Sequence, residues 1–296
     1  MISKKEFNNL KNEVSILCFS YNFKKSIEKC LDSILSQIIS IPIKIYCIDD
    51  GSTDGTQEIL KKYADKNKKK ITLILSNENT KSPITLLLSG KYNIDFNSKY
   101  FCQIDGDDYW IDNYNLQKKL KVLINNEKII GCSSITKMIS KNKIVLIKAA
   151  KTLFNRSDLI AHRNYLSFYC HTSSLLWKNY HYNKQNKLPF PTHYNKQTDG
   201  DAFLFYEMLN SGHSIYMIPE VLSVYNYTGR GVWSGASKET QYKMNKKLQR
   251  RIFFYTPLKY KIFYVMIMIY NLFKFKKKKL FNLFFKIFKI RPINEE

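Results

Sequence analysis

The sequence predicts an α/β protein with a mostly parallel, Rossmann-like sheet that is flanked by helices. In the first 110 residues, short apolar runs suited to buried strands alternate with segments whose apolar residues recur at helical spacing. Two of those apolar runs end in clusters of aspartate, glycine and small polar residues, which favour turns. Apolar residues make up 44% of the 296-residue chain, which is enough for a buried core and excludes wholesale disorder.

The first half of the chain carries the clearest alternation of elements. Its expected strands are four apolar runs, over residues 14–19, 43–48, 71–75 and 100–104. Asn22 is suited to cap the helix after the first strand, whose apolar positions from Ile27 to Ile38 recur at helical spacing. Asp54 with Gln57 three residues later resembles a capping box and predicts a helix through Tyr63. A third helix is expected over residues 83–92.

Beyond residue 110 the pattern is looser but continuous. A helix is expected over residues 115–125, then short strands, then polar and aromatic loops over residues 154–198. A second helix over residues 201–210 and a strand over residues 215–224 complete the predicted elements. No internal repeat and no Gly/Ser linker interrupts the chain. Residues 1–240 are therefore predicted to form one domain, with a donor half at about 1–110 and an acceptor half at about 111–240.

The last segment, residues 241–296, differs in composition. From Lys243 to Glu296 there are fifteen Lys or Arg residues and two acids, so this segment supplies +13 of the net charge of +24. Its apolar runs, 262–273 and 280–288, are too short to span a membrane, and they are interleaved with Lys. This pattern predicts basic amphipathic helices that contact an anionic membrane surface through residues 243–289. The alternative is a helical hairpin packed on the domain or on a second subunit, with Lys as its solvated face.

The start of the chain and its cysteines bear on location. Residues 1–13 have no apolar core of a signal peptide. Six cysteines are scattered without a C-x-x-C pair, which argues against a zinc site or a disulfide framework: Cys18, Cys30, Cys47, Cys102, Cys132 and Cys170. We therefore expect a cytoplasmic protein that is peripheral on the inner face of the cell membrane.

Carboxylates gather where two of the predicted strands end. Asp49 and Asp50 follow one strand, and Asp105, Asp107 and Asp108 follow another. Ligands of open parallel sheets bind just beyond the carboxyl ends of the strands, so both groups would face one crevice. Carboxylate oxygens favour Mg²⁺ or Mn²⁺, which bind one or two carboxylates together with diphosphate oxygens. The alternative is that Asp is common in turns for purely local reasons.

Four motifs in order add to this prediction. They are VSILCFSYN at 14–22, CLDSILSQ at 30–37, IDDGSTDGT at 48–56 and QIDGDDYW at 103–110. The series resembles the nucleotide-sugar glycosyltransferases of family 2, which have the GT-A fold. The resemblance is specific through about residue 110 and extends more weakly to about residue 235.

The resemblance implies roles for residues of the donor half. Contacts with the nucleotide base and ribose are implied for Phe19, Tyr21, Asp49 and Asp50. Asp105 would lie near the ribose, and Asp107 would bind the Mg²⁺ or Mn²⁺ ion. Such an ion offsets the charge that builds up on the leaving diphosphate.

In the acceptor half, the segment from Thr198 to Phe205 resembles the motif that holds the catalytic base. Asp201 is our choice for the base, with Asp199 as the runner-up. The family usually has Glu next to Asp, and here Gly200 stands in place of that Glu. Asp201 would equally serve as a plain helix N-cap.

Two further segments resemble parts of the family site. Residues 229–235 resemble a closing segment over the donor phosphates, which implies donor contacts for Arg230 and Trp233; Trp233 would equally suit the core. His171 lies in a segment that resembles the acceptor wall, although a histidine beside an apolar strand is commonly a packed structural residue. Where relatives carry a Gly-rich stretch before the metal motif, this chain has residues 79–84, with Lys81 as a possible diphosphate contact.

Together these features predict an inverting, metal-dependent glycosyltransferase. The donor would be a nucleoside diphosphate sugar, with UDP favoured, and the acceptor a saccharide or a lipid-linked molecule of surface polysaccharide, capsule or lipooligosaccharide synthesis. The alternative is a basic nucleic-acid- or membrane-binding protein that keeps the fold without catalysis. Nucleic acid is not the expected partner, because the Lys residues of the tail alternate with Phe, Leu and Ile and do not mark a known RNA or DNA module.

Overall fold

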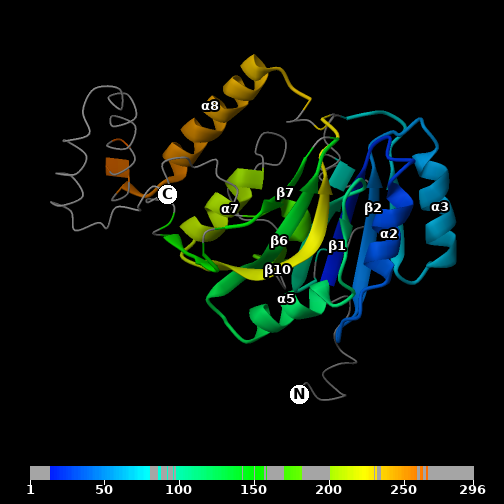
Figure 1. The fold of residues 1–296 in the computed structure, drawn as a ribbon, viewed down its shortest axis with the longest axis horizontal. Coiled ribbons are helices and arrows are strands. Elements are labelled where there is room, and N and C mark those ends of the chain that lie inside the picture. Colours follow the sequence, from blue (N-terminus) through cyan, green and yellow to red (C-terminus); the bar gives the residue numbers. More distant parts are fainter. Residues whose placement is uncertain are drawn as a thin grey trace.

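The structure is a computed structural model that describes residues 14–80, 86–87, 92, 96, 98–141, 143–149, 151–156, 158, 170–181, 201–229, 231, 235–258, 261–262 and 265. Within these residues ten strands form one sheet, with the order β3-β2-β1-β4-β9-β6-β10-β5; β7 pairs with β6 and β8 with β10 (Figure 1). The strands are β1 Val14–Ser20, β2 Ile43–Asp49, β3 Ile71–Leu75, β4 Tyr100–Asp105, β5 Tyr109–Trp110, β6 Ile129–Ile139, β7 Ile144–Ile147, β8 Leu153–Phe154, β9 Leu176–Lys178 and β10 Ser214–Asn226. The helices are α2 Ile27–Leu35, α3 Thr56–Lys66, α5 Asn115–Ile124, the 3₁₀ turn η1 Thr172–Ser174, α7 Asp201–Asn210 and α8 Lys238–Tyr255.

The first four strands are parallel, as the sequence predicts. β1 lies between β2 and β4, so the chain order along the sheet reverses at β1. Register places Ser20 level with Asp49, and Phe19 level with Asp105. The carboxyl ends of β1, β2 and β4 therefore meet at one edge of the sheet, which is where open α/β sheets bind ligands.

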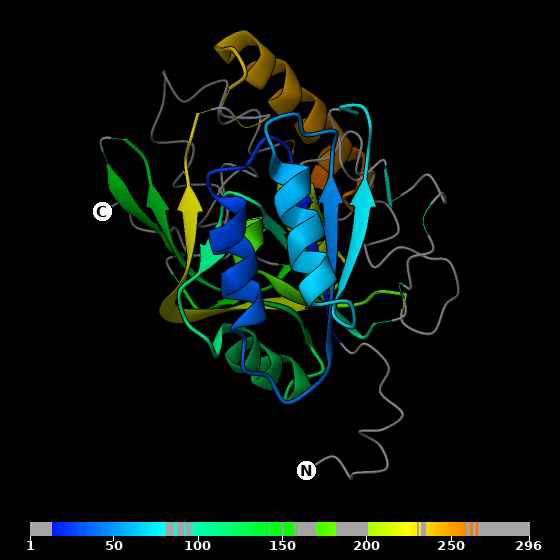
Figure 2. The ribbon, with the colours of Figure 1, turned by 90° about the vertical axis from the view of Figure 1, so that its right-hand side faces the viewer.

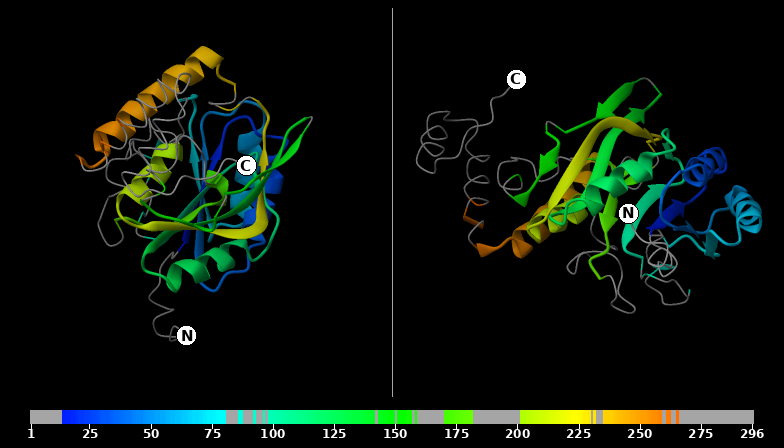
Figure 3. Two further views of the ribbon diagram at one scale, coloured as in Figure 1. Left: turned by 60° about the vertical axis from the view of Figure 1, so that its left-hand side comes forward. Right: turned by 90° about the horizontal axis from the view of Figure 1, so that it is seen from below.

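The second half of the sheet is mixed. β9 is antiparallel to both β4 and β6, and it joins the two halves of the sheet. β6 and β10 are parallel, and one of their register shifts lies between Ile218 and Val221, so that Pro219 and Glu220 are left without a partner residue in the register. Pro219 has no N–H to donate to a neighbouring strand, and β10 bends strongly along its length (Figure 3).

Helices cover both faces of the sheet. The predicted apolar stripe of the first helix is buried from Ile27 to Ile34, but Ile38, which was predicted to belong to it, lies beyond the end of α2 and is 51% exposed. The buried stripe packs with parts of α3 and α5 on one face, and Figure 2 shows α2 and α3 in front of the first strands. On the other face, Phe203, Leu204 and their neighbours in α7 form a second apolar cluster.

Two predicted helix caps are wrong. Asn22 lies at φ +56 before the helix, and its Oδ1 accepts a hydrogen bond from the Thr53 amide; the helix begins only at Ile27. Asp54 accepts from the amide and hydroxyl of Thr56, two residues later, rather than from Gln57. Asn22 therefore stabilises the loop after β2 and not its own helix, whereas Asp54 bonds the first residue of α3 but does not form the predicted capping box with Gln57.

The structure describes the first part of the predicted tail. α8 packs on the α7 face through the buried Ile252, and Thr256 hydrogen-bonds the Tyr206 hydroxyl at 2.9 Å. The predicted apolar runs of residues 262–273 and 280–288 lie outside the described residues except for Ile262 and Val265. Among the residues that are described, no helix is both long and apolar enough to cross a membrane.

Candidate active site

Asp49 is the buried centre of the loop that follows β2. Its Oδ1 accepts hydrogen bonds from the Ser52 amide and Gln57 Nε2, both at 2.8 Å. Its Oδ2 accepts from the hydroxyls of Ser20 at 2.8 Å and Ser52 at 2.5 Å. These four bonds fix the turn between β2 and α3, so in this structure Asp49 shapes the site from inside the protein.

Asp50, the next residue, is held on one side only. Its Oδ1 accepts from the amide of Thr80 at 2.9 Å and from its hydroxyl at 2.6 Å. Within the part of the chain that the structure describes, its other oxygen, Oδ2, accepts no hydrogen bond. Asp50 is therefore the member of this pair that has an oxygen left for a hydroxyl or amide of a ligand.

The two aromatic residues predicted to contact the nucleotide differ in exposure. Phe19 is 6% exposed and belongs to the apolar cluster under α7, whereas Tyr21 is 41% exposed. The Phe19 carbonyl accepts the Gly106 amide at 2.7 Å, so Phe19 anchors the loop after β4 through its backbone. Tyr21 is the aromatic ring at this edge that is open to stacking.

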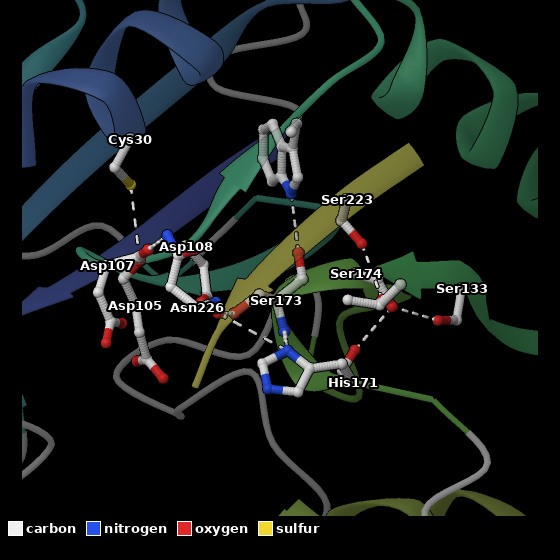
Figure 4. Close-up of polar contacts among 12 residues, drawn as sticks. Cys30, Asp105, Asp107, Asp108, Ser133, His171, Ser173, Ser174, Ser223 and Asn226 are labelled. Atoms are coloured by element: carbon white, nitrogen blue, oxygen red, sulfur yellow. Dashed lines mark hydrogen bonds and ion pairs between the residues drawn. The ribbon is translucent and has the colours of Figure 1, made fainter. Parts of the chain in front are cut away.

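The loop Asp105–Asp108 is tightly packed at its base. A Cβ on Gly106 would lie 2.8 Å from Ile27 Cδ1 and 2.9 Å from Phe23 Cδ2, which explains the glycine between the two acids. The Asp105 carbonyl accepts the Asp108 amide at 2.9 Å and the Cys30 thiol at 3.6 Å. Figure 4 shows the carboxylates of Asp105 and Asp107 pointing in the same direction, away from the strands.

Asp107 and Asp108 are carboxylates in low-dielectric surroundings. Burial raises the pKa of Asp107 to about 6. Burial, together with the charges of Asp105 and Asp107, raises the pKa of Asp108 well above its usual value, although hydrogen bonds from Ser173 and Asn226 oppose this. Three acids in one loop therefore repel one another, and a cation at this position would relieve that repulsion.

His171 lies beside this loop, at the start of η1. Its ring stacks on Tyr225 with a centroid distance of 4.1 Å, and its Nδ1 accepts the Ser173 amide at 3.4 Å. Burial lowers the pKa of His171 to about 4, so the ring is neutral at pH 7. Its Nδ1 is 3.7 Å from Asp108 Oδ2, but a neutral ring makes this a polar contact and not an ion pair. With Nδ1 acting as an acceptor, Nε2 carries the proton and is the donor to anything bound at this wall.

The sequence model of the family described as "Glycosyl transferase family 2" matches residues 15–183, more than half of the chain. The chain belongs to glycosyl transferase family 2. Its fold is the GT-A fold that the motifs imply, because solved GT-A glycosyltransferases superpose on most of it. S. aureus TarS 1–349 in complex with UDP matches over 90% of this chain and 73% of that one, with a TM-score of 0.60 and 14% identity. The match with the Pyrobaculum calidifontis mannosyltransferase PcManGT, in complex with GDP-Man and Mn²⁺, covers 88% of this chain and 70% of PcManGT, with a TM-score of 0.52 and 17% identity.

Proteins related in sequence include some whose names state no activity. The uncharacterized protein Rv1520 of Mycobacterium tuberculosis is 25% identical over 231 residues, which are 75% of this chain and 61% of that protein. This family 2 chain thus spans less than two thirds of the length of its mycobacterial relatives. The uncharacterized glycosyltransferase MG025 of Mycoplasma genitalium is 25% identical over 235 residues, 78% of this chain and 73% of its own.

Several family residues predicted from the sequence are not placed. Asp199, Arg230, Trp233 and Lys81 lie outside the described residues. Asp201 is the first residue of α7, in agreement with the predicted helix start, but its side chain is outside what the structure describes. The roles of these residues, and of the residues described above, stay predictions.

The residues that are placed fit a family-type metal ion. Within the described ranges no three His, Cys, Asp or Glu side chains lie close enough to hold a metal alone. Asp108 is occupied by Ser173 and Asn226, whereas the carboxylate of Asp107, the predicted metal ligand, points away from the strands beside that of Asp105 (Figure 4). Mg²⁺ and Mn²⁺ suit such a site, because they bind one or two protein carboxylates and complete their shell with phosphate oxygens and water. The donor set therefore fits an ion that binds together with a diphosphate.

Three residues at the site were not predicted to act there: Ser173, Tyr225 and Asn226. The Tyr225 ring stacks on His171, and burial together with the charges of Asp108, Asp107 and Asp105 raises the pKa of Tyr225. Asn226 ends β10, and its Nδ2 donates to the Asp107 carbonyl. Two features of the sequence could have indicated these residues. One is the stretch from His171 to Ser174, which resembles the family, and the other is the polar end of the apolar run over residues 215–224.

Proposed function

We propose that this chain is an inverting, metal-dependent glycosyltransferase that moves a sugar from a nucleoside diphosphate sugar to an acceptor hydroxyl. The observation that carries the proposal is the loop Asp105–Asp108 at the carboxyl end of β4, level with the ends of β1 and β2 in a member of family 2. Tyr21 and Asp50 would bind the nucleoside on one side of this loop. A bound Mg²⁺ or Mn²⁺, held by Asp107, would neutralise charge on the departing diphosphate.

The acceptor side supplies the proton transfer in this proposal. Asp201, or Asp199 as the runner-up, would accept the proton of the attacking hydroxyl. Asp201 begins a ten-residue helix, and the helix N-terminus favours the ionised carboxylate there. His171 would donate its Nε2 proton to an oxygen of the acceptor and so orient it. Holding the two substrates in line lowers the barrier by several kcal/mol, on the order of the gains seen for well-oriented reactions.

Donor, acceptor and pathway are proposed at the level of chemical class. Solved neighbours contain UDP, UDP-GlcNAc or GDP-Man, which supports a nucleotide-sugar donor. A UDP-sugar is favoured, with a saccharide or lipid-linked acceptor of surface polysaccharide, capsule or lipooligosaccharide synthesis. The proposed location is cytoplasmic and peripheral on the inner face of the cell membrane, where such an acceptor lies.

An exposed apolar stripe supports the membrane part of the proposal. Phe254 at the end of α8, and Leu258, Ile262 and Val265 after that helix ends, are between 40% and 79% exposed. Lys259 and Lys261 stand between them in the sequence, and residues 243–296 carry a net charge of +13. Apolar side chains beside Lys and Arg suit the interface of an anionic bilayer.

Thermal unfolding with a panel of nucleotide sugars, each with and without Mn²⁺, tests the proposal. A donor at 100 times its Kd stabilises a protein by about 2.7 kcal/mol, which is enough to raise Tm measurably. Because the proposed site binds the diphosphate through the metal ion, we expect the true donor to raise Tm only when Mn²⁺ is present. The Asp107→Asn variant removes the negative charge of the proposed metal-binding side chain but keeps its shape. We expect this variant to lose the Mn²⁺-dependent rise in Tm and at least a hundredfold of donor turnover. Asp112→Asn is the matched control, since the Asp112 carboxylate pairs with Lys118 and accepts the Tyr114 amide, and within the described residues it bonds to no residue of the loop Asp105–Asp108. A wild-type protein with no Mn²⁺-dependent response to any nucleotide sugar would contradict the proposed function.

A further inference from the structure

A closed set of hydrogen bonds joins the loop Asp105–Asp108 to the acceptor half of the molecule. Its centre is Asp108, which is 1% exposed. Asp108 Oδ2 accepts a hydrogen bond from the Ser173 hydroxyl in η1, and Oδ1 accepts from the Asn226 amide at the end of β10, at 3.1 Å. Figure 4 shows these bonds next to the two carboxylates that point away from the strands.

Two further hydrogen bonds complete this network. The Asn226 side chain returns to the loop, where its Nδ2 donates to the Asp107 carbonyl. Trp110, just after the loop, donates its Nε1–H to the Ser173 carbonyl at 2.8 Å. The backbone of Asp107 is therefore tied to β10 directly and to η1 through Asp108.

The chemistry of Asp108 differs from that of Asp107. Both oxygens of Asp108 are engaged by protein donors, and the side chain is shielded from solvent. A metal ligand needs a lone pair directed at an open position, which a carboxylate in this setting does not offer. The residues that Asp108 holds are also those that position the acceptor wall, because His171 precedes η1 and Tyr225 precedes Asn226, and their rings stack.

We infer that Asp108 is a positioning residue that fixes Asp107 relative to η1 and the end of β10, and so couples metal binding in the donor half to the acceptor wall. The inference rests on the proposed function, in which Asp107 binds the metal ion. A buried hydrogen-bond network of this kind holds its residues in place only when every polar group in it has a partner, since a buried group left without one lowers stability. Loss of Asp108 therefore loosens the loop at the residue that has to meet the metal ion with a defined geometry.

The test compares variants by the Mn²⁺ concentration that gives half-maximal donor turnover and by Mn²⁺ binding in the presence of UDP, followed by electron paramagnetic resonance. Asp108→Ala is expected to raise that concentration at least tenfold. Ser173→Ala removes one bond and leaves the carboxylate in place, so a rise of three- to tenfold is expected even if Asp108→Ala does not fold. Ser223→Ala is the matched control. Ser223 lies on β10, as Asn226 does, and its variant removes a buried hydrogen bond of 2.8 Å to Thr136 on β6 without touching Asp108; we expect it to stay within twofold of wild type.

The conservative variant separates positioning from direct metal binding. In Asp108→Asn, the amide oxygen still accepts the Asn226 amide, and the new NH₂ donates to the Ser173 hydroxyl. We expect it to recover Mn²⁺ activation to within threefold of wild type. An Asn variant as defective as the Ala variant would make Asp108 a metal ligand and overturn the inference.

Other results would also overturn it. If Asp108→Ala and Ser173→Ala lower Tm but leave Mn²⁺ activation and binding unchanged, the hydrogen-bond network around Asp108 only stabilises the fold. That result leaves the proposed function intact, provided that Asp107→Asn abolishes Mn²⁺ binding. A wild-type protein that binds Mn²⁺ no better than Asp107→Asn would overturn the inference and the proposed function together.

Discussion

His171 shows how burial sets the chemistry of a single residue. A histidine on the surface is partly protonated near pH 6.5, but this ring stacks on Tyr225 and is shielded from water. The sequence suggested a residue of the acceptor wall or a packed structural one; its contacts are those of a packed residue, and the acceptor role stays a prediction. A neutral ring with a fixed tautomer is a hydrogen-bond donor of constant character across the physiological pH range.

The titration of His171 predicts a pH dependence of stability. Its pKa is about 4 in the folded protein and has an ordinary value of 6.5, so the unfolded chain binds the additional proton between these values. The free energy of unfolding therefore falls as pH drops from 6.5 to 4, by about 3 kcal/mol from this residue. Urea unfolding across that range, compared with His171→Gln, isolates the effect.

The comparison with the variant is needed because Asp107 acts in the opposite direction. Its pKa of about 6 means that the folded state binds the extra proton as pH falls below 6. Both proteins share that contribution, so it cancels in the difference between them. A difference that stays constant from pH 4 to 7 would show that His171 is not held neutral.

Residues were predictable where the chemistry lies within a short stretch of sequence. Asp105, Asp107 and Asp108 follow an apolar strand and stand out in the sequence alone. Ser173 and Asn226 do not, because each reaches Asp108 from more than sixty residues away. Only the pairing of β4 with β9, and of β10 with β5 and β6, brings those segments to the loop.

At the scale of elements, the turn between β2 and α3 depends on backbone approach. Gly51 has φ +78, and a Cβ there would lie 2.5 Å from the backbone carbon of Glu78. Gly55 also has a positive φ, of +98, but its Cβ would meet only the flexible side chain of Lys24, at 3.2 Å. The two glycines of one turn therefore differ in what surrounds them.

This difference predicts unequal costs for the two alanine variants. Gly55→Ala carries the left-handed backbone penalty alone, about 1 kcal/mol in unfolding free energy. Gly51→Ala adds a clash with backbone that cannot move aside, so we expect about 3 kcal/mol or more. Denaturant unfolding of both variants measures this, and equal costs would mean that the segment at Glu78 yields to the new side chain.

The exposed stripe on α8 and the residues after it predicts binding to lipid. Wild type is expected to sediment with vesicles that contain anionic lipid, and less so as salt is raised. Replacing both Phe254 and Leu258 with Gln removes apolar contact without changing charge, and should weaken binding about tenfold. Ile144 and Leu146 are exposed apolar residues on β7, and their double Gln variant is the matched control.

Competing RNA gives the same experiment a second arm. Binding to RNA but not to anionic vesicles would favour the nucleic-acid alternative. Equal vesicle binding by wild type and the Phe254/Leu258 variant would instead show that the stripe packs against protein.

Most elements were predictable because they follow local periodicity, and α7 begins and ends where its pattern does. The helix after β1 begins later than expected, at Ile27, because the side chain of Asn22 bonds across to Thr53. β10 extends to Asn226 past the apolar run, since its last residues pair with β6. Local sequence could not show either tertiary contact.

At the scale of the whole molecule, the parallel half of the sheet follows from the sequence and the mixed half does not. Alternation of strand and helix permits few topologies, and β1 to β4 adopt the expected one. β9 is three residues long and inserts antiparallel between β4 and β6, a pairing that no local pattern specifies. This short strand joins the parallel half of the sheet to the mixed half, and η1 with His171 directly precedes it.

Asp49 has a consequence for how a ligand would be received. Because its four hydrogen bonds already hold the turn after β2, the conformational entropy of ordering that turn is lost during folding and not on binding. A nucleotide arriving at Asp50 and Tyr21 would meet a surface already in its final shape. In the proposed function, the turn after β2 would then act as a rigid template for the nucleotide.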